Sequence, residues 1–223
     1  MSAPPPVVES ESKGVLHFLK PGQPDAAVML CPPPILGSAE QLAELDEVRA
    51  VYHAASDADK QAAYGEKKFT VYNFTGAVGP FFVAANLPKT TAFFEKVQTD
   101  AETVTDLGKD HFKRPRPFVT DPSLENGKLE KSFSYPSGHS TESMVLALVL
   151  ADLLPDQQEA IIAHARLMGW HRVQTARHYP SDIMAGRTLA LAIWQQLKQS
   201  DEYQKEFAAA KAELDGARNA AKN

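Results

Sequence analysis

The chain has little that would tie it to a membrane, a nucleic acid or a disulfide framework. Cys31 is the single cysteine among 223 residues, so no disulfide can form within the chain. The best apolar stretch, residues 144–154, is too short to cross a bilayer and contains Asp152. Basic residues are not in excess, because 23 Lys and Arg stand against 28 Asp and Glu. The net charge of −5 therefore gives no indication of nucleic-acid binding.

Two further patterns are missing. The N-terminus has no basic start followed by an apolar run, so the sequence is not expected to contain a signal peptide. No segment alternates polar and apolar residues with period two, as a half-buried strand would. Hydrophobic residues make up 43% of the chain, and a chain of this length can bury a sizeable core. We therefore expect an all-α fold, a single-domain helical bundle.

Helical spacing and capping residues predict how the chain is organised into three regions and a series of helices. Residues 1–30 are expected to be flexible or loosely packed, residues 31–200 to form the helical domain with the site, and residues 201–223 to add a C-terminal helix and tail to the same domain. The expected helices cover residues 38–52, 57–64, 66–86, 88–111, 137–154, 155–176 and 181–199. Residues 118–135 contain residue types that are typical of turns, and we predict that they form a loop.

A basic segment, residues 109–117, ends one predicted helix. It contains four cations within eight residues, and prolines stiffen the turn that follows. Taken alone, such a run is typical of a solvated surface. At a helix end, however, the turn can hold Lys109 and Arg116 at a fixed separation. Arg offers a bidentate fork to phosphate oxygens and Lys offers a point charge.

A second segment, Tyr135-Pro136-Ser137-Gly138-His139, opens an apolar helix. The free N–H groups and positive dipole end of a helix N-terminus favour anions. Gly138 allows close approach of the backbone, Ser137 can donate its hydroxyl, and His139 falls in the first turn. A capping serine beside a surface histidine is the alternative interpretation of this segment alone.

A third segment, residues 172–182, joins two predicted helices and contains Arg172, His178 and Asp182. A carboxylate can accept the Nδ1 proton of a histidine, which fixes the tautomer and leaves Nε2 as an unprotonated nucleophile. By itself a His–Asp pair at this spacing favours a structural role. The three segments together carry more weight than any one of them.

Together the segments resemble the three-part signature of the phosphatidic acid phosphatase type 2 superfamily. That superfamily includes bacterial class A nonspecific acid phosphatases, membrane lipid phosphatases and vanadium haloperoxidases. The resemblance spans residues 109–182 and is highly specific. The Pro-rich residues 30–34, followed by Ser38, also look like the start of class A acid phosphatases. The family usually has Ser where this chain has His171, and that departure bears on site polarity and pH preference.

The resemblance implies a metal-independent acid phosphatase that needs no cofactor. Lys109, Arg116 and Arg172 would bind the phosphoryl oxygens, and Ser137 with the Gly138 N–H would add hydrogen bonds. The remaining roles fall to two histidines and an aspartate.

His178 would attack phosphorus and form a phosphohistidine, while Asp182 would orient it. His139 would protonate the leaving alkoxide and then activate water. His171, His111 and Tyr135 are the residues expected to lie near this machinery without contacting phosphorus.

The expected substrates are small phosphate monoesters, and vanadate would act as a phosphate mimic and inhibitor. The resemblance also implies a periplasmic or secreted protein and a possible homodimer. A vanadium-dependent haloperoxidase, a lipid phosphate phosphatase acting peripherally and a degenerate anion-binding protein are the alternatives. The last of these is disfavoured by the intact set Lys109, Arg116, His139, Arg172, His178 and Asp182.

Overall fold

The described part of the protein, residues 14–221 of a computed structural model, is built from helices alone and contains no strand. This confirms the all-α prediction. The α-helices are α1 (Ala26–Met29), α2 (Ala39–Ala54), α3 (Asp57–Gly65), α4 (Thr75–Val78), α5 (Pro88–Phe112), α6 (Pro117–Thr120), α7 (Gly138–Leu153), α8 (Gln158–Gln174), α9 (Pro180–Leu197) and α10 (Asp201–Ala220). Short 3₁₀ helices are η1 (Val71–Phe74), η2 (Ala84–Asn86), η3 (Pro122–Leu124) and η4 (Pro155–Gln157).

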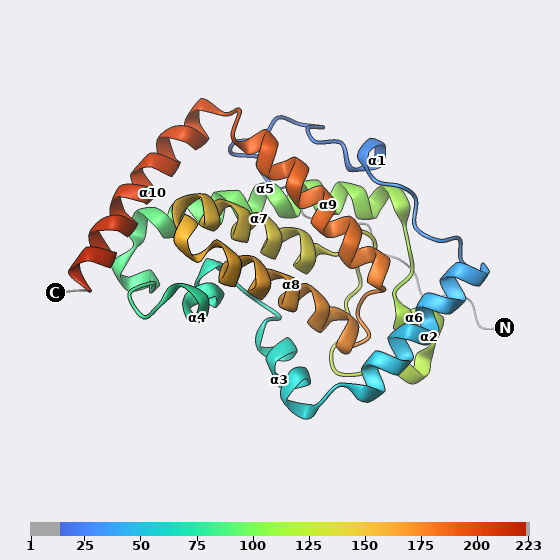
Figure 1. Ribbon diagram of the computed structural model, residues 1–223. Coiled ribbons are helices and arrows are strands. Elements are labelled where there is room, and N and C mark those ends of the chain that lie inside the picture. Colours follow the sequence, from blue (N-terminus) through green and yellow to red (C-terminus); the bar gives the residue numbers. More distant parts are fainter. Residues whose placement is uncertain (1–13, 222–223) are drawn as a thin grey trace.

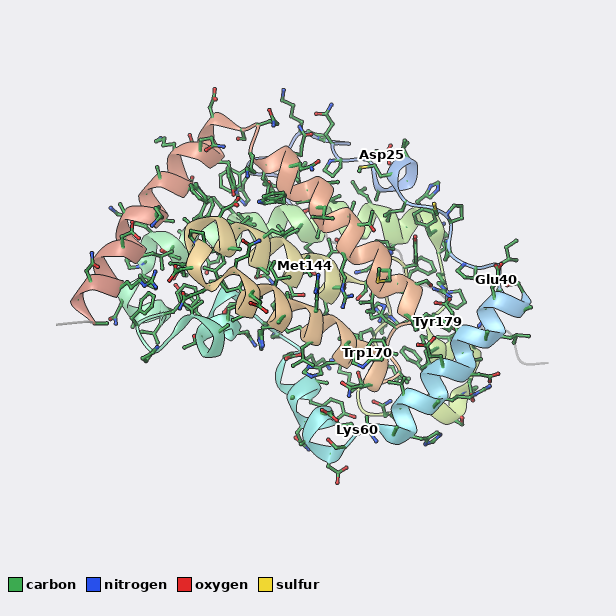
Figure 2. All side chains as sticks on the ribbon, viewed as in Figure 1. Asp25, Glu40, Lys60, Met144, Trp170 and Tyr179 are labelled. Atoms are coloured by element: carbon green, nitrogen blue, oxygen red, sulfur yellow. The ribbon has the colours of Figure 1, made fainter. Side chains whose placement is uncertain are left out.

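Helix α7 is the centre of the bundle. It packs against α5, α8 and α9, as Figure 1 shows for the gold helix between its green and orange neighbours. A helix enclosed in this way has to be apolar around most of its circumference, and the sequence from Met144 onward meets that requirement. Val145, Leu146 and Leu150 are completely buried, and Met144 lies near the middle of the molecule in Figure 2.

Two glycines allow the neighbouring helices to approach the start of α7. A Cβ placed on Gly186 of α9 would lie 2.9 Å from the carbonyl oxygen of Ser137 and 2.9 Å from the Cβ of Ser140. A Cβ on Gly169 of α8 would lie 3.3 Å from the Ser140 hydroxyl oxygen. The absence of these two side chains therefore sets how closely α8 and α9 surround the first turn of α7.

Residues 14–30 are tied to α5. The backbone N–H groups of His17, Phe18 and Leu19 donate to the carboxylate of Asp100, at 2.7, 2.8 and 2.9 Å. Phe18 is buried against Phe93 and a residue of α10. One buried carboxylate thus satisfies three backbone donors of residues 14–30, a segment that was predicted to be flexible or loosely packed. Residues 1–13 lie outside the described part.

The continuous helix predicted over residues 66–86 is wrong. The region holds only η1, α4 and η2, joined by irregular turns. Gly79 ends α4 with φ of 121°, a conformation open to glycine, and Pro80 follows it. The aromatic side chains that suggested a buried helix are nonetheless in the core, since Phe74 and Phe82 are completely buried.

The start of α9 also differs in detail from the prediction. The predicted helix starts at residue 181, whereas α9 begins at Pro180 and its N-cap is Tyr179. Ser181 lies inside the first turn, where its N–H and hydroxyl both donate to Glu44 of α2, at 2.8 and 2.9 Å. These bonds fasten α2 to the start of α9, which Figure 2 marks with Tyr179.

We expect Gly186→Ala to lower the free energy of unfolding by about 1–3 kcal/mol, because the new methyl group overlaps backbone atoms that cannot rotate away. Thermal denaturation followed by circular dichroism measures this. Gly216→Ala is the matched control, since Gly216 is exposed in α10 with open space around it and the same change there should be neutral or slightly stabilising. Equal melting temperatures for the two variants would contradict the close-approach argument.

Candidate active site

Four helix ends meet at one end of the bundle and form the candidate site. α5 and α8 finish there, while α7 and α9 begin there. Backbone hydrogen bonds connect the segments that link these ends. The Ser137 N–H donates to the carbonyl of Asp182 at 3.1 Å, and the Ser134 N–H donates to the carbonyl of Arg114 at 2.9 Å. The three segments singled out in the sequence are therefore neighbours in space.

The His178 ring has a defined orientation between an aspartate and an arginine. Its Nδ1 lies 3.3 Å from Oδ2 of Asp182, and its Nε2 lies 3.0 Å from Nη1 of Arg116. A guanidinium can only donate, so Nε2 accepts and the ring proton resides on Nδ1. Burial and the charge of Arg116 lower the pKa of His178 to about 3, so the ring is neutral over most of the pH scale.

Asp182 is completely buried and receives several donors. The guanidinium of Arg114 lies 2.6 Å from Oδ1, the hydroxyl of Ser134 donates to Oδ2 at 2.5 Å, and the N–H of Tyr179 donates to Oδ2 at 2.9 Å. These partners keep the pKa of Asp182 below its ordinary value in spite of burial. The carboxylate stays ionised and holds the Nδ1 proton of His178 in place.

Arg114 supports Asp182 and does not face the site. Its guanidinium stacks 3.9 Å from the ring centroid of Tyr179 and also pairs with Glu44 at 2.6 Å. Lys113, its neighbour in the basic run, is exposed. Of the four cations in that run, only Lys109 and Arg116 are directed toward the first turn of α7 and toward His178.

Arg116 is held from three sides. It donates to the carbonyl and hydroxyl oxygens of Ser132 at 2.8 and 3.0 Å, and to the carbonyl of Arg177 at 3.0 Å. Complete burial lowers its pKa to about 10, which leaves it charged at neutral pH. The guanidinium is thus fixed in position before any ligand arrives.

Lys109 and Arg172 are the other two predicted phosphate ligands, and both are buried. The ammonium of Lys109 pairs with Asp106 at 2.8 Å and lies 3.2 Å from the point where a Cβ on Gly138 would stand. Arg172 donates to Glu130 at 2.7 Å. Lys109 therefore reaches the first turn of α7 because residue 138 has no side chain.

Ser137 and His139 flank that first turn. The Ser137 hydroxyl oxygen caps α7 by accepting from the N–H of Ser140 at 3.4 Å. Nε2 of His139 lies 3.2 Å from the carbonyl oxygen of Glu66, to which it donates, and its ring packs against Phe69. Burial, together with the charge of Arg172, holds the pKa of His139 well below its ordinary value.

His171 occupies the position where the family usually has serine. It is buried, and its Nδ1 lies 2.7 Å from the carboxylate of Glu66. Glu66 therefore contacts two histidines, His139 through its carbonyl and His171 through its side chain. Sequence reasoning missed Glu66, because a single glutamate just past a helix end carries no motif.

Two residues expected near the site lie outside the cluster. His111 is exposed at the end of α5, where its ring stands edge-on to Phe112. The Tyr135 hydroxyl donates to the carbonyl oxygen of Cys31 at 2.6 Å, so it fastens the Pro-rich segment to the loop before α7. Neither side chain is brought to His178.

Glu142 is a partly buried carboxyl that the sequence did not single out. Its Oε1 lies 3.2 Å from the same Gly138 Cβ position that Lys109 approaches, and Gln98 donates to its Oε2 at 3.1 Å. Burial raises its pKa to about 7, although Gln98 and Lys109 act in the opposite direction. An apolar helix gives little sequence signal for such a group, apart from its place one turn after Gly138.

Comparison with known proteins identifies the family. The PAP2 superfamily profile matches residues 97–205, which include all three segments. A non-specific acid phosphatase of Providencia stuartii is 31% identical over 230 residues, covering 96% of this chain and 90% of that protein. This chain belongs to the PAP2 superfamily.

Other similar proteins include an acid phosphatase of Zymomonas mobilis. It is 28% identical over 227 residues, covering 96% of this chain and 83% of that protein. A bacterial vanadium-dependent iodoperoxidase has a TM-score of 0.57 at 20% identity, over 78% of this chain and 53% of that one, and shares the fold. The acid phosphatase relatives of this PAP2 protein support a phosphatase activity.

Residues 14–221 contain neither a metal-binding cluster nor a membrane-spanning helix. No group of three or more His, Cys, Asp or Glu side chains within that range could hold a metal ion. Among the helices that the structure describes, none combines the length and the apolar character needed to cross a membrane.

We expect His178 to stay neutral in the free PAP2 protein across roughly pH 5 to 8, because its pKa is lowered to about 3. As the pH falls, His178 is protonated in the unfolded chain before it is protonated in the folded chain. Its contribution to stability is therefore lost as the pH falls from the ordinary histidine pKa toward the pKa of His178 in the folded chain. Histidine ¹⁵N chemical shifts measure the ionisation directly. A titration of the His178 ring inside this range would contradict the assignment.

Glu142→Gln should remove a pH-dependent loss of stability. The folded pKa of Glu142 lies above the unfolded value of 4.5, so its ionisation makes folding less favourable as pH rises from there through about 7. Relative to the variant, the natural chain should lose on the order of 2–3 kcal/mol over that window. Urea denaturation at several pH values measures this, with exposed Glu125→Gln as the control. Parallel stability curves for the natural chain and Glu142→Gln would rule out the raised pKa.

Proposed function

We propose that this chain is an acid phosphatase of the class A type, which hydrolyses small phosphate monoesters through a phosphohistidine on His178 and uses no metal. The observation that carries the proposal is the orientation of the His178 ring. Its Nδ1 proton is directed at ionised Asp182, and its Nε2 lone pair faces Arg116. An unprotonated Nε2 beside a fixed cation has the arrangement that a nucleophile for a bound phosphoryl group requires.

The cations around this nucleophile supply the charge that phosphoryl transfer needs. Lys109, Arg116 and Arg172 would contact the phosphoryl oxygens, with the Ser137 hydroxyl and the Gly138 N–H as additional donors. All five residues are buried. Fixed donors in a site with little water stabilise the charge that develops in the transition state and need no reorganisation.

Each chemical step can then be assigned to a named atom. His178 Nε2 forms a bond to phosphorus while the ester P–O bond breaks, and His139 gives a proton to the departing alkoxide. A water molecule then attacks phosphorus, its proton passes to His139, and the N–P bond breaks to release inorganic phosphate. Asp182 keeps the proton on Nδ1 of His178 throughout.

The low pKa of His139 fits this sequence of events. In the free site the burial of its ring and the charge of Arg172 disfavour the imidazolium. A phosphate dianion opposes these cations and favours protonation of a neighbouring ring. His139 would therefore take up its proton together with the substrate, which favours activity on the acid side of neutrality.

We expect the natural chain to hydrolyse p-nitrophenyl phosphate in EDTA, and His178→Ala to lose at least about 10³-fold in kcat, because it lacks the nucleophile. Rapid acid-free quenching followed by ³¹P NMR should detect phosphohistidine in the natural chain. Vanadate should inhibit the natural chain competitively.

His53→Ala is the matched control, since His53 is exposed on α2 and its ring lies against Tyr52 of the same helix. It should keep full activity. Hydrolysis that requires an added divalent metal, or that survives in His178→Ala, would exclude the proposed mechanism. Halide oxidation that depends on vanadate and peroxide, in a chain without phosphatase activity, would instead favour a haloperoxidase.

A further inference from the structure

The carboxylate of Glu130 lies on the cations to which the proposed function assigns the phosphate. Its Oε1 accepts from Nη2 of Arg172 at 2.7 Å, and its Oε2 lies 3.3 Å from Nη1 of Arg177. Arg116 adds its attraction, and the three arginines together lower the pKa of Glu130 in spite of burial. An ionised internal carboxylate is thus paired with one proposed phosphate ligand and attracted by a second.

This pairing leaves donors unsatisfied. Within the described part of the chain, Nε of Arg172 and Nη1 of Arg177 are buried and have no hydrogen-bond partner. Oε2 of Glu130 also lacks one, since its contact with Arg177 is an ion pair without hydrogen-bond geometry. The two carboxylate oxygens therefore leave some of the arginine N–H donors without an acceptor. An oxyanion with three or four oxygens could reach more of them.

Glu130 differs from the other carboxylates that pair with cations around the site. Asp182 and Glu44, the partners of Arg114, belong to α9 and α2, and Asp106 shares α5 with Lys109. These are fixed by regular helices. Glu130 instead lies in the irregular stretch between η3 and α7, and its side chain is 24% exposed while that of Arg172 is 4% exposed. Its carboxylate can withdraw toward solvent without disturbing a helix.

From this geometry we propose that Glu130 is an internal competitor of phosphate. Its carboxylate occupies an oxyanion position on Arg172 in the free protein, and a bound phosphate displaces it. The inference rests on the proposed function, because it takes the site to bind phosphate. Displacement reduces the affinity for every phosphate monoester and for the product alike. Glu130 is thus a residue that sets KM, and its return to Arg172 favours release of inorganic phosphate.

The test is the affinity of the full chain for inorganic phosphate and for vanadate, measured by isothermal titration calorimetry. Glu130→Gln keeps the size of the side chain and one acceptor oxygen but removes the charge. We expect it to bind both anions roughly tenfold more tightly. We expect Glu130→Ala to behave alike. In hydrolysis of p-nitrophenyl phosphate, KM should fall by a similar factor while kcat is retained.

Glu125→Gln is the matched control. It makes the same charge change five residues earlier in the same stretch, at an exposed position, and should leave phosphate affinity unchanged. Tighter binding in both Glu130 variants but not in Glu125→Gln supports the inference. Weaker binding in the Glu130 variants would overturn it, because Glu130 would then serve to align Arg172. Unchanged binding would overturn it as well.

The same titrations separate the inference from the proposed function. If the natural chain binds phosphate and Glu130→Gln binds it no better, only the competitor role of Glu130 fails. If neither binds phosphate or vanadate, the assignment of the cations to phosphate fails, and the competitor role fails with it. Melting curves confirm in each case that the variant is folded.

Discussion

A carboxylate without access to solvent joins the parts of this site. Asp182 receives the guanidinium of Arg114, the hydroxyl of Ser134 and the ring of His178, and its carbonyl accepts from the N–H of Ser137. Arg114, Ser137 and His178 come from the first, second and third sequence segments, respectively. A buried carboxylate without donors would destabilise the fold by several kcal/mol. The burial of Asp182 therefore requires the donors that surround its carboxylate. The orientation of His178, the proposed nucleophile, is therefore set by the same interaction that holds the loops together.

The ligand-free site is an unusual electrostatic environment for a protein interior. Arg116 and Arg172 remain charged although burial lowers their pKa values, and His139 and His178 are kept neutral beside them. Cations that are close together repel, and the fold offsets this with backbone carbonyls and with the carboxylate of Glu130. The fold thus holds these cations in place before any ligand is present, as the proposed anion site requires. Stability is given up where the proposed chemistry needs positive charge, a compromise that functional sites commonly make.

Local patterns predicted most of this architecture. The long helices and the pairing of His178 with Asp182 follow from spacing over a few residues. Residues 66–86 could not be predicted correctly, because aromatic content indicates burial but not continuity, and Gly79 breaks the helix. Glu66 and Glu130 were missed for a related reason. Each reaches the site from an irregular segment, and their partners, His171 and Arg172, lie far along the chain.

The hydrogen bond from Tyr135 to the carbonyl of Cys31 has a practical consequence. Cys31 is exposed and is the single thiol of the chain, so one reagent can label it without a second site of reaction. Its backbone is one hydrogen bond away from the residue that precedes Pro136 and Ser137. A fluorophore attached there would report on the loop that leads into α7. Cys31 of the natural chain can therefore carry a fluorophore without any mutation, and stopped-flow fluorescence could then measure how fast that loop responds to an anion.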